Sequence, residues 1–131
     1  MVHLSTKSHG QHTFLDYNGF FPSKGQNENW FLQKLQQVVE RSTAREVHAH
    51  IEAFDGIKSP PGFAAVVLLD ESHLTAHCYS ELGWLAIDAF TCGGTDPSDM
   101  IADLKAVLEK EMPSLVVMQE QKVSRFLHSE D

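Results

Sequence analysis

The hydrophobic positions repeat with a helical period in two segments of the chain. From Glu28 to about Ser42, large apolar residues recur three or four positions apart, which predicts an amphipathic helix. The same spacing returns after Asp96 or Ser98, either of which can cap a helix, and it ends before Pro113, which cannot continue one. Each predicted helix has one apolar stripe, so each is expected to pack on a hydrophobic layer.

Around these helices the pattern changes to a period of two or to short apolar runs, which are typical of strands. The elements follow the order strand, helix, four strands, helix, strand. This order favours an α+β two-layer sandwich, in which a mainly antiparallel sheet has two helices packed on one face. The six predicted strands cover Gln11–Tyr17, Glu46–Phe54, Phe63–Leu69, His73–Tyr79, Trp84–Cys92 and Leu115–Met118.

Neither a repeat nor a low-complexity tract divides the sequence. A chain of 131 residues with 42% hydrophobic content is long enough to bury one core, so we expect a single domain over residues 1–131. Disorder is expected only at the two ends, Met1–His9 and His128–Asp131.

The charge and the apolar runs limit the partners of the chain. The net charge is −8 and the ten basic residues are scattered, which argues against nucleic acid as a partner. The longest apolar run, Phe63–Leu69, is too short to span a bilayer, and the polar N-terminus lacks the hydrophobic core of a signal peptide. We therefore expect no membrane association and a cytoplasmic location, where the two cysteines are free thiols.

The segment DESHLTAHCYSELGWLAIDAFTCGG places unusual chemistry in a predicted hairpin. If Ser80–Gly83 forms its loop, Tyr79 pairs with Trp84, and the same register puts Cys92 beside the Glu71–Ser72 junction. Opposed residues share a face of the sheet. One face then carries Leu74, Ala76, Cys78, Leu85, Ile87 and Ala89, where the helices should pack. The other face carries His73, Thr75, His77, Asp88 and Cys92, with only Ala86 and Phe90 between them.

Three interpretations of this polar face follow from its residues. His73 with His77, or His48 with His50, could share a metal, but neither pair has the ligand spacing of a structural zinc site, so no metal is expected. Cys92 could act as a nucleophile with His77 as its base. The alternative is a solvated face on which Cys92 is a small apolar residue at a strand end.

The same segment resembles the processing and active-site segment of the bacterial S-adenosylmethionine decarboxylase proenzymes, a pyruvoyl-dependent family. The matching residues are Glu71-Ser72-His73, His77, Glu81 and the strand end Phe90–Gly93. The early stretch HGQHTFLDYNG and the order of the elements are compatible with this family.

The resemblance implies that the chain cuts itself between Glu71 and Ser72. The products would be a β chain, Met1–Glu71, and an α chain, Ser72–Asp131. In the family, the serine attacks the preceding carbonyl and the resulting ester eliminates, so that Ser72 would become a pyruvoyl group. That group forms a Schiff base with the substrate amine and takes up the electrons of decarboxylation, as pyridoxal phosphate does elsewhere. Neither pyridoxal phosphate nor a metal is expected, and the product would be decarboxylated S-adenosylmethionine for spermidine synthesis.

The resemblance also implies roles for other residues. His77 would accept the Cα proton of the Ser72 ester during processing, and Cys92 would donate a proton to the substrate carbon after carbon dioxide leaves. Glu81 would bind the ribose hydroxyls of the substrate. The small bacterial members are typically homodimers of αβ units, with sites near the subunit interface.

The sequence departs from the family just before the proposed cut. The family has a serine that assists processing where this chain has Ala64, and Thr75 is the candidate to replace its hydroxyl. This departure leaves a second reading open, in which the chain is an uncleaved, non-enzymatic relative that regulates a partner.

A second departure concerns the aromatic residue that stacks on adenine in the family. Ile57 and Lys58 stand near that place, and Phe54 or Phe63 could substitute. Base stacking on an aromatic ring contributes roughly 1 to 3 kcal/mol. A pyruvoyl decarboxylase of arginine or ornithine is therefore the alternative enzyme, since the acidic chain favours a cationic substrate.

Overall fold

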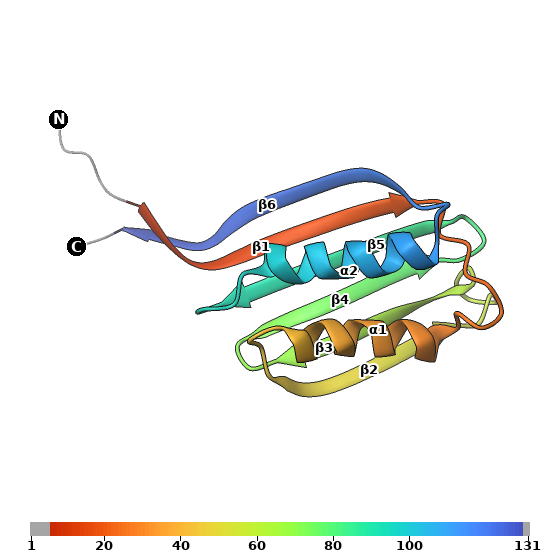
Figure 1. Cartoon of the computed structure of the whole chain (residues 1–131), viewed down its shortest axis with the longest axis horizontal. Coiled ribbons are helices and arrows are strands. Elements are labelled where there is room, and N and C mark those ends of the chain that lie inside the picture. The colour runs from red at the N-terminus through yellow and green to blue at the C-terminus, as the bar shows by residue number, and fades with distance from the viewer. Residues whose placement is uncertain (1–5, 130–131) are drawn as a thin grey trace.

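Six strands pair in one antiparallel sheet in the computed structural model, which describes residues 6–129 of the chain. The strands are β1 (Thr6–Asn18), β2 (Glu46–Phe54), β3 (Gly62–Leu69), β4 (Ser72–Tyr79), β5 (Trp84–Cys92) and β6 (Val116–Ser129). Their order across the sheet is β2-β3-β4-β5-β1-β6. The first strand of the chain therefore lies between two strands from its C-terminal half (Figure 1).

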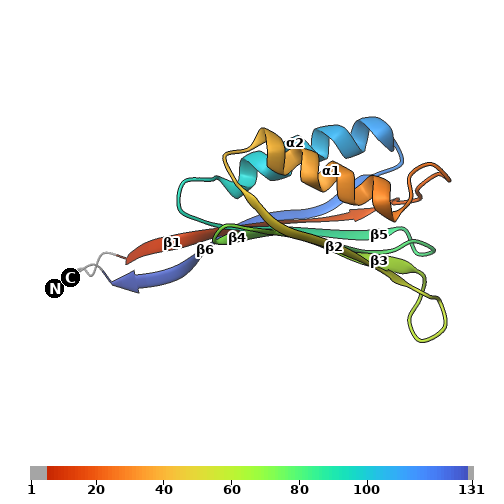
Figure 2. The same cartoon turned by 90° about the horizontal axis from the view of Figure 1, so that it is seen from below.

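Polar side chains begin both helices. Asn27 caps α1 (Glu28–Arg41) by accepting a hydrogen bond from a backbone N–H of the first turn. Asp96 caps α2 (Pro97–Glu111) by accepting from the backbone N–H of Ser98, and a proline suits the first helical position. Both helices cover the same face of the sheet (Figure 2).

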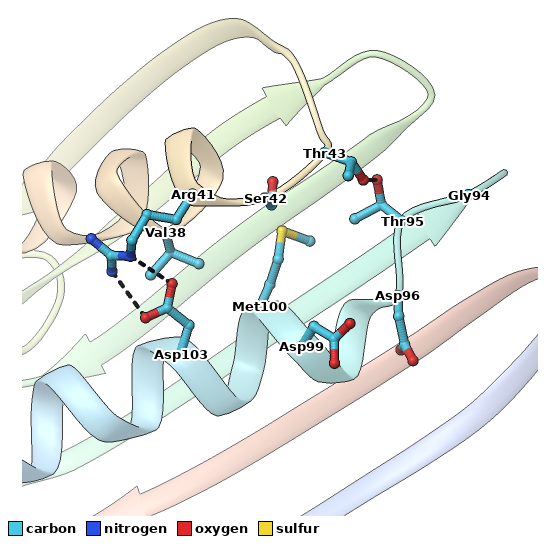
Figure 3. A pocket seen from close by; sticks show the side chains of 10 residues that line it. All are labelled: Val38, Arg41, Ser42, Thr43, Gly94, Thr95, Asp96, Asp99, Met100 and Asp103. Atoms are coloured by element: carbon cyan, nitrogen blue, oxygen red, sulfur yellow. Dashed lines mark hydrogen bonds and ion pairs between the residues drawn. The ribbon is translucent and has the colours of Figure 1, made fainter.

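An ion pair joins the two helices at their solvent side. The Arg41 guanidinium of α1 donates two hydrogen bonds, of 2.8 and 3.0 Å, to the Asp103 carboxylate of α2 (Figure 3). Because both side chains are partly exposed, we expect this pair to orient the helices more than to stabilise them.

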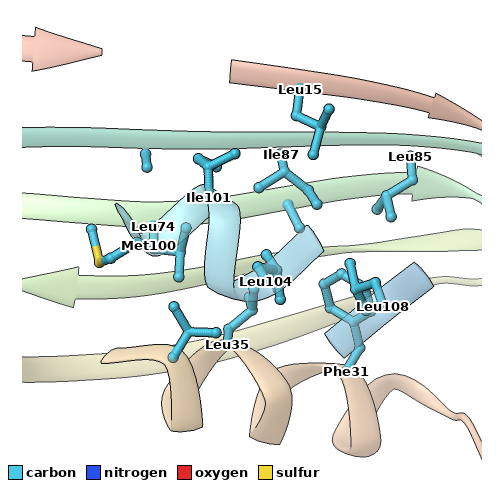
Figure 4. Close-up of a cluster of buried hydrophobic side chains, with 14 of the residues drawn as sticks. Leu15, Phe31, Leu35, Leu74, Leu85, Ile87, Met100, Ile101, Leu104 and Leu108 are labelled. Atoms are coloured by element: carbon cyan, nitrogen blue, oxygen red, sulfur yellow. The ribbon is translucent and has the colours of Figure 1, made fainter. Parts of the chain in front are cut away.

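The hydrophobic core lies between the helices and the sheet (Figure 4). The apolar stripes of both helices face the inward side chains of the strands, and these side chains are almost completely excluded from water. Burial of each large apolar side chain contributes about 1.5 to 3 kcal/mol, so this layer supplies most of the stability. Its central residues are Leu15, Phe31, Leu35, Leu74, Leu85, Ile87, Met100, Ile101, Leu104 and Leu108.

No described helix covers the opposite side of the sheet, which we call the open face (Figure 2). The strand pairings place on it the side chains that alternate with the core residues. Its central part consists of His12 and Phe14 on β1, Ala64, Val66 and Leu68 on β3, His73, Thr75, His77 and Tyr79 on β4, and Trp84, Ala86, Asp88, Phe90 and Cys92 on β5.

The predicted element order and the two-layer α+β sandwich are confirmed. The predicted end of the last strand at Met118 is wrong, because β6 continues to Ser129 as the partner of a β1 that begins at Thr6. All β6 side chains are exposed, so no apolar alternation marked the strand, and backbone hydrogen bonds to β1 hold it. The disorder expected at 6–9 and 128–129 is therefore wrong, whereas 1–5 and 130–131 lie outside the described residues.

The strand β2 has its predicted bounds, and only part of it is shielded from water. Ala49 and Ile51 are partly buried, whereas Val47 and Ala53 are exposed. This strand is an edge of the sheet with a register shift at its start, so only its middle lies under α1.

Gly62 provides a test of how closely β3 and β4 approach. A Cβ atom at Gly62 would collide with the backbone carbonyl of Cys78, whereas one at Gly25 would meet no atom within 4 Å. We expect Gly62→Ala to lower the free energy of unfolding by about 1 to 3 kcal/mol, as overpacking does. Gly25→Ala is the control and should change it little. Urea denaturation checks this, and equal stability of the two variants would contradict the packing described.

Candidate active site

The hairpin of β4 and β5 has the register predicted from the sequence. Tyr79 pairs with Trp84 and Thr75 pairs with Asp88. The face predicted to meet the helices is buried, including Cys78, which is 1% exposed. Burial raises the pKa of the Cys78 thiol to about 11, so this cysteine is a protonated core residue.

The Glu71–Ser72 junction lies in a tight turn between β3 and β4. Leu69 and Ser72 pair across this turn, so only Asp70 and Glu71 connect the strands. Glu71 has φ 65°, in the left-handed region that residues with a Cβ rarely adopt. This conformation costs roughly 1 to 3 kcal/mol, which the pairing of the flanking strands must offset. The peptide bond proposed for cleavage therefore follows a strained residue.

Contacts on both sides hold this turn in place. The backbone N–H of Asp70 donates to the carbonyl oxygen of Arg45 at 2.9 Å, and the Arg45 guanidinium donates to the Asp70 carboxylate at 3.2 Å. Ser72 is 7% exposed, and its Oγ accepts a hydrogen bond of 3.1 Å from the backbone N–H of Cys92. An N–H aimed at Oγ stabilises the negative charge that develops when the hydroxyl loses its proton.

Cys92 lies beside the junction, as the predicted register requires. It is the last residue of β5, and its thiol is free and partly buried. Because the Cys92 backbone touches Ser72 Oγ, the two residues assigned to catalysis at opposite ends of the hairpin sequence meet at one end of the fold.

A groove of about 380 Å³ runs over the junction on the open face. The residues that line it are Val47, Leu68, His73 and Phe90 together with the turn residues 69–72. The His73 and Phe90 rings stack with their centroids 5.5 Å apart. Burial, and then the neighbouring His12, lower the pKa of His73, which favours a neutral imidazole next to the junction.

His77 does not reach the junction of its own chain. It follows Ser72 by five positions on the same extended strand, which corresponds to ~16 Å. His77 instead lines a second cavity of about 410 Å³, together with Tyr79, Trp84 and Asp16. Glu81 is exposed in the loop that follows Tyr79, so it belongs to this end of the hairpin as well. The predicted site residues therefore form two groups at opposite ends of β4.

Ala64 occupies a position from which a side-chain hydroxyl could contact His77. Ala64 on β3 pairs directly with His77 on β4, and both side chains lie on the open face. A serine in this place would stand beside the imidazole. Thr75 lies on the same face, two residues before His77.

The aromatic candidates for binding a base differ in exposure. Phe63 is 5% exposed, and its ring centroid is 5.0 Å from that of Phe31 in the core, so it has no surface to offer a ligand. Ile57 is 87% exposed in a loop. The Phe54 ring centroid lies 6.1 Å from that of Tyr79, next to the cavity that His77 lines.

One polar pair on the open face was not assigned from the sequence. His12 Nε2 of β1 lies 2.9 Å from the Asp88 carboxylate of β5, and both side chains are partly buried. The order of the strands brings them together, because β1 pairs with β5 although the two residues are 76 positions apart in the sequence. Only a prediction of which strands are neighbours could have found this pair.

A further cavity, of about 260 Å³, lies on the helical side of the sheet and contains none of the predicted site residues (Figure 3). Arg41, Asp99 and Asp103 line it, together with the hydrogen-bonded hydroxyls of Thr43 and Thr95. Within residues 6–129, no three His, Cys, Asp or Glu side chains form a group suited to a metal ion. The described helices include none with the length and apolar character needed to cross a bilayer.

Comparison with known proteins gives one consistent family. The sequence model of the S-adenosylmethionine decarboxylase family matches residues 11–121. The S-adenosylmethionine decarboxylase proenzyme of Thermotoga petrophila is 32% identical over 84% of this chain and 82% of its own. That of Brevibacillus brevis is 50% identical over 65% of this chain, and that of Carboxydothermus hydrogenoformans 43% identical over 52%. The matches cover 62% and 54% of the length of these last two proteins.

A solved structure supports the fold. The crystal structure of the adenosylmethionine decarboxylase from Aquifex aeolicus superposes with a TM-score of 0.64 over 95% of this chain and 92% of that one. The two sequences are 22% identical, so this similarity shows a shared α+β sandwich.

The two thiols should differ in reactivity. The thiolate is the reactive form, so the buried Cys78, whose pKa is raised to about 11, should resist alkylation at pH 8 while Cys92 reacts. Peptide mass spectrometry after timed alkylation checks this, with Cys92→Ser as the control for the labelled site. Both thiols should react in urea. Equal rates in the folded protein would contradict the burial of Cys78.

Proposed function

Since the chain belongs to the S-adenosylmethionine decarboxylase family, we propose that it decarboxylates S-adenosylmethionine with a pyruvoyl group made from its own Ser72. The observation that carries the proposal is the Glu71–Ser72 junction. A strained turn residue precedes a buried serine whose Oγ contacts the backbone N–H of Cys92, and a groove opens in front of them. The two free thiols agree with a cytoplasmic location.

The chemistry of self-cleavage fits these residues. Ser72 Oγ attacks the Glu71 carbonyl carbon, and the amide C–N bond breaks as the ester forms. Removal of the Ser72 Cα proton expels the Glu71 carboxylate, and addition of water then releases ammonia and leaves a pyruvoyl group. Relief of the left-handed Glu71 conformation favours the first step, because the ester no longer requires the tight turn.

The same residues fit the pyruvoyl group and its reaction. Bound to the substrate amine, such a group accepts the electron pair left by the departing carbon dioxide. The contact of the Cys92 backbone with Ser72 Oγ supports a role for the Cys92 thiol in returning a proton to the substrate carbon. The stacked His73 and Phe90 rings give the groove an aromatic lining next to the junction.

His77 fits its role as a base only if it serves a second copy of the chain. The ~16 Å that separates it from its own Ser72 is beyond the reach of an imidazole. A two-fold axis through the open face would bring the His77 end of one hairpin to the Ser72 end of the other. No helix within residues 6–129 covers the open face, which carries exposed Leu68, Tyr79 and Trp84, and this supports a homodimer packed sheet against sheet.

The cavity around His77 then supplies the substrate pocket of the neighbouring junction. Tyr79, which lines this cavity, and Phe54, whose ring lies beside it, offer aromatic faces for the adenine in place of the residue missing near Lys58. Glu81 is exposed in the loop at the same end, which supports its proposed role in binding the ribose hydroxyls. These aromatic faces favour S-adenosylmethionine over arginine or ornithine, which have no flat ring system to stack.

One observation favours a second candidate function. Ala64 leaves no hydroxyl beside His77, which is the arrangement expected of an uncleaved, regulatory relative. Intact mass of the purified protein decides between the two.

We expect two chains, Met1–Glu71 and Ser72–Asp131, the second blocked by a pyruvoyl group. Ser72→Ala should give one full-length chain and no turnover of S-adenosylmethionine, whereas Cys92→Ala should still be cut and lose most of its turnover. Denaturing electrophoresis and carbon dioxide release measure both. A wild-type chain that stays intact would exclude the enzyme.

The assignment of His77 to the second copy has its own test. Ser72→Ala and His77→Ala chains are expressed separately and together, with tags of different mass. Neither variant alone should be cut. Together, heterodimers pair an intact Ser72 on one chain with an intact His77 on the other, so up to about half of the His77→Ala chains should be cut when the subunits associate at random. Absence of any cleavage in the mixture, with heterodimers present, would show that His77 acts within its own chain.

A further inference from the structure

Arg125 of β6 lies in register with the proposed catalytic cysteine. Gly10 of β1 pairs with Cys92 on one side and with Arg125 on the other. Two strand spacings, about 10 Å, therefore separate the backbones of Cys92 and Arg125. The Arg125 guanidinium lies over the ring of Phe90, 5.3 Å from its centroid, on the open face. Phe90 also lines the groove over the Glu71–Ser72 junction.

The local backbone gives Arg125 an apolar setting. The next residue, Phe126, has φ 54°, an unfavourable left-handed conformation, and its ring lies against Phe90 with centroids 5.9 Å apart. A Cβ atom at Gly10 would be only 3.3 Å from both rings. The glycine therefore lets the two rings close over β1 beside the guanidinium. The Arg125 side chain is exposed, and its apolar contact is with the face of the Phe90 ring, which attracts the guanidinium.

Arg125 carries a positive charge next to strands that have no basic residue of their own. Strands β2 to β5 contain no lysine or arginine. On β6, Lys122 forms an ion pair with Asp96 on the helical side. Among residues 6–129, no carboxylate forms an ion pair with Arg125. The fold thus brings one cation without an acidic partner against Phe90, a residue that lines the groove.

We propose that Arg125 binds the α-carboxylate of the amino-acid substrate, a role that rests on the function proposed above. A guanidinium holds a carboxylate through two parallel hydrogen bonds and so fixes its direction as well as its position. The carboxylate leaves as neutral carbon dioxide, so this contact stabilises the bound substrate more than the transition state. Arg125 is in this sense a specificity residue, and it lies beyond residue 121, where the match to the family ends.

The test compares Arg125→Gln with Lys122→Gln, which removes the same charge from the opposite face of the same strand. Arg125→Gln should raise KM for S-adenosylmethionine about 10- to 100-fold, the range for a hydrogen bond between charged groups, and change kcat less than about threefold. Arg125→Lys should recover part of this loss. Inhibition by decarboxylated S-adenosylmethionine, which lacks the carboxylate, should be unchanged. Lys122→Gln should resemble wild type.

The intact mass of the protein distinguishes failure of the proposed function from failure of this inference alone, because cleavage at Ser72 does not involve the substrate carboxylate. A wild-type chain that is neither cut nor active would overturn the proposed function, and this inference with it. Normal cleavage and turnover with equal KM for the two variants would overturn the inference alone. An equal loss of affinity for substrate and for decarboxylated product would also overturn it, because Arg125 would then only support the fold.

Discussion

The one-sided covering of the sheet is the constraint on which the rest of the structure depends. Two helices bury one face of the central strands, so most residues on that face must be apolar. The remaining residues are free of this demand, and they carry the histidines, the acidic residues and Cys92. Segregation of this kind requires the register to hold within one residue, since a slip would exchange the two faces of a strand.

The register of β4 and β5 could be predicted because it is local. The loop Ser80–Gly83 fixed the pairing of Tyr79 with Trp84, and alternation then separated core from surface residues. The meeting of Ser72 and Cys92 followed from the same pairing. The helices were similarly marked by apolar spacing, and the second helix also by its capping residue.

Non-local pairing explains what the sequence did not reveal. The contact of His12 with Asp88 depends on β1 entering the sheet beside β5, and no short-range pattern encodes that neighbour. The length of β6 depends on the backbone of β1, because its own side chains are all exposed. The distance between Ser72 and His77 follows from the predicted strand itself, because the two residues are five positions apart along it. The resemblance to the family indicates which residues act together in processing, but it does not indicate whether they belong to one chain or to two.

The order of the strands has a consequence for a protein cut at Glu71. The N-terminal fragment would keep β1, β2, β3 and α1, and the C-terminal fragment would keep β4, β5, β6 and α2. In the sheet, however, β1 is hydrogen-bonded to β5 on one side and to β6 on the other, and β3 remains hydrogen-bonded to β4. The fragments would be interleaved, each lacking part of the core without the other, so separating them would require unfolding both. One broken peptide bond would turn a single polypeptide into an obligate heterodimer without moving a strand.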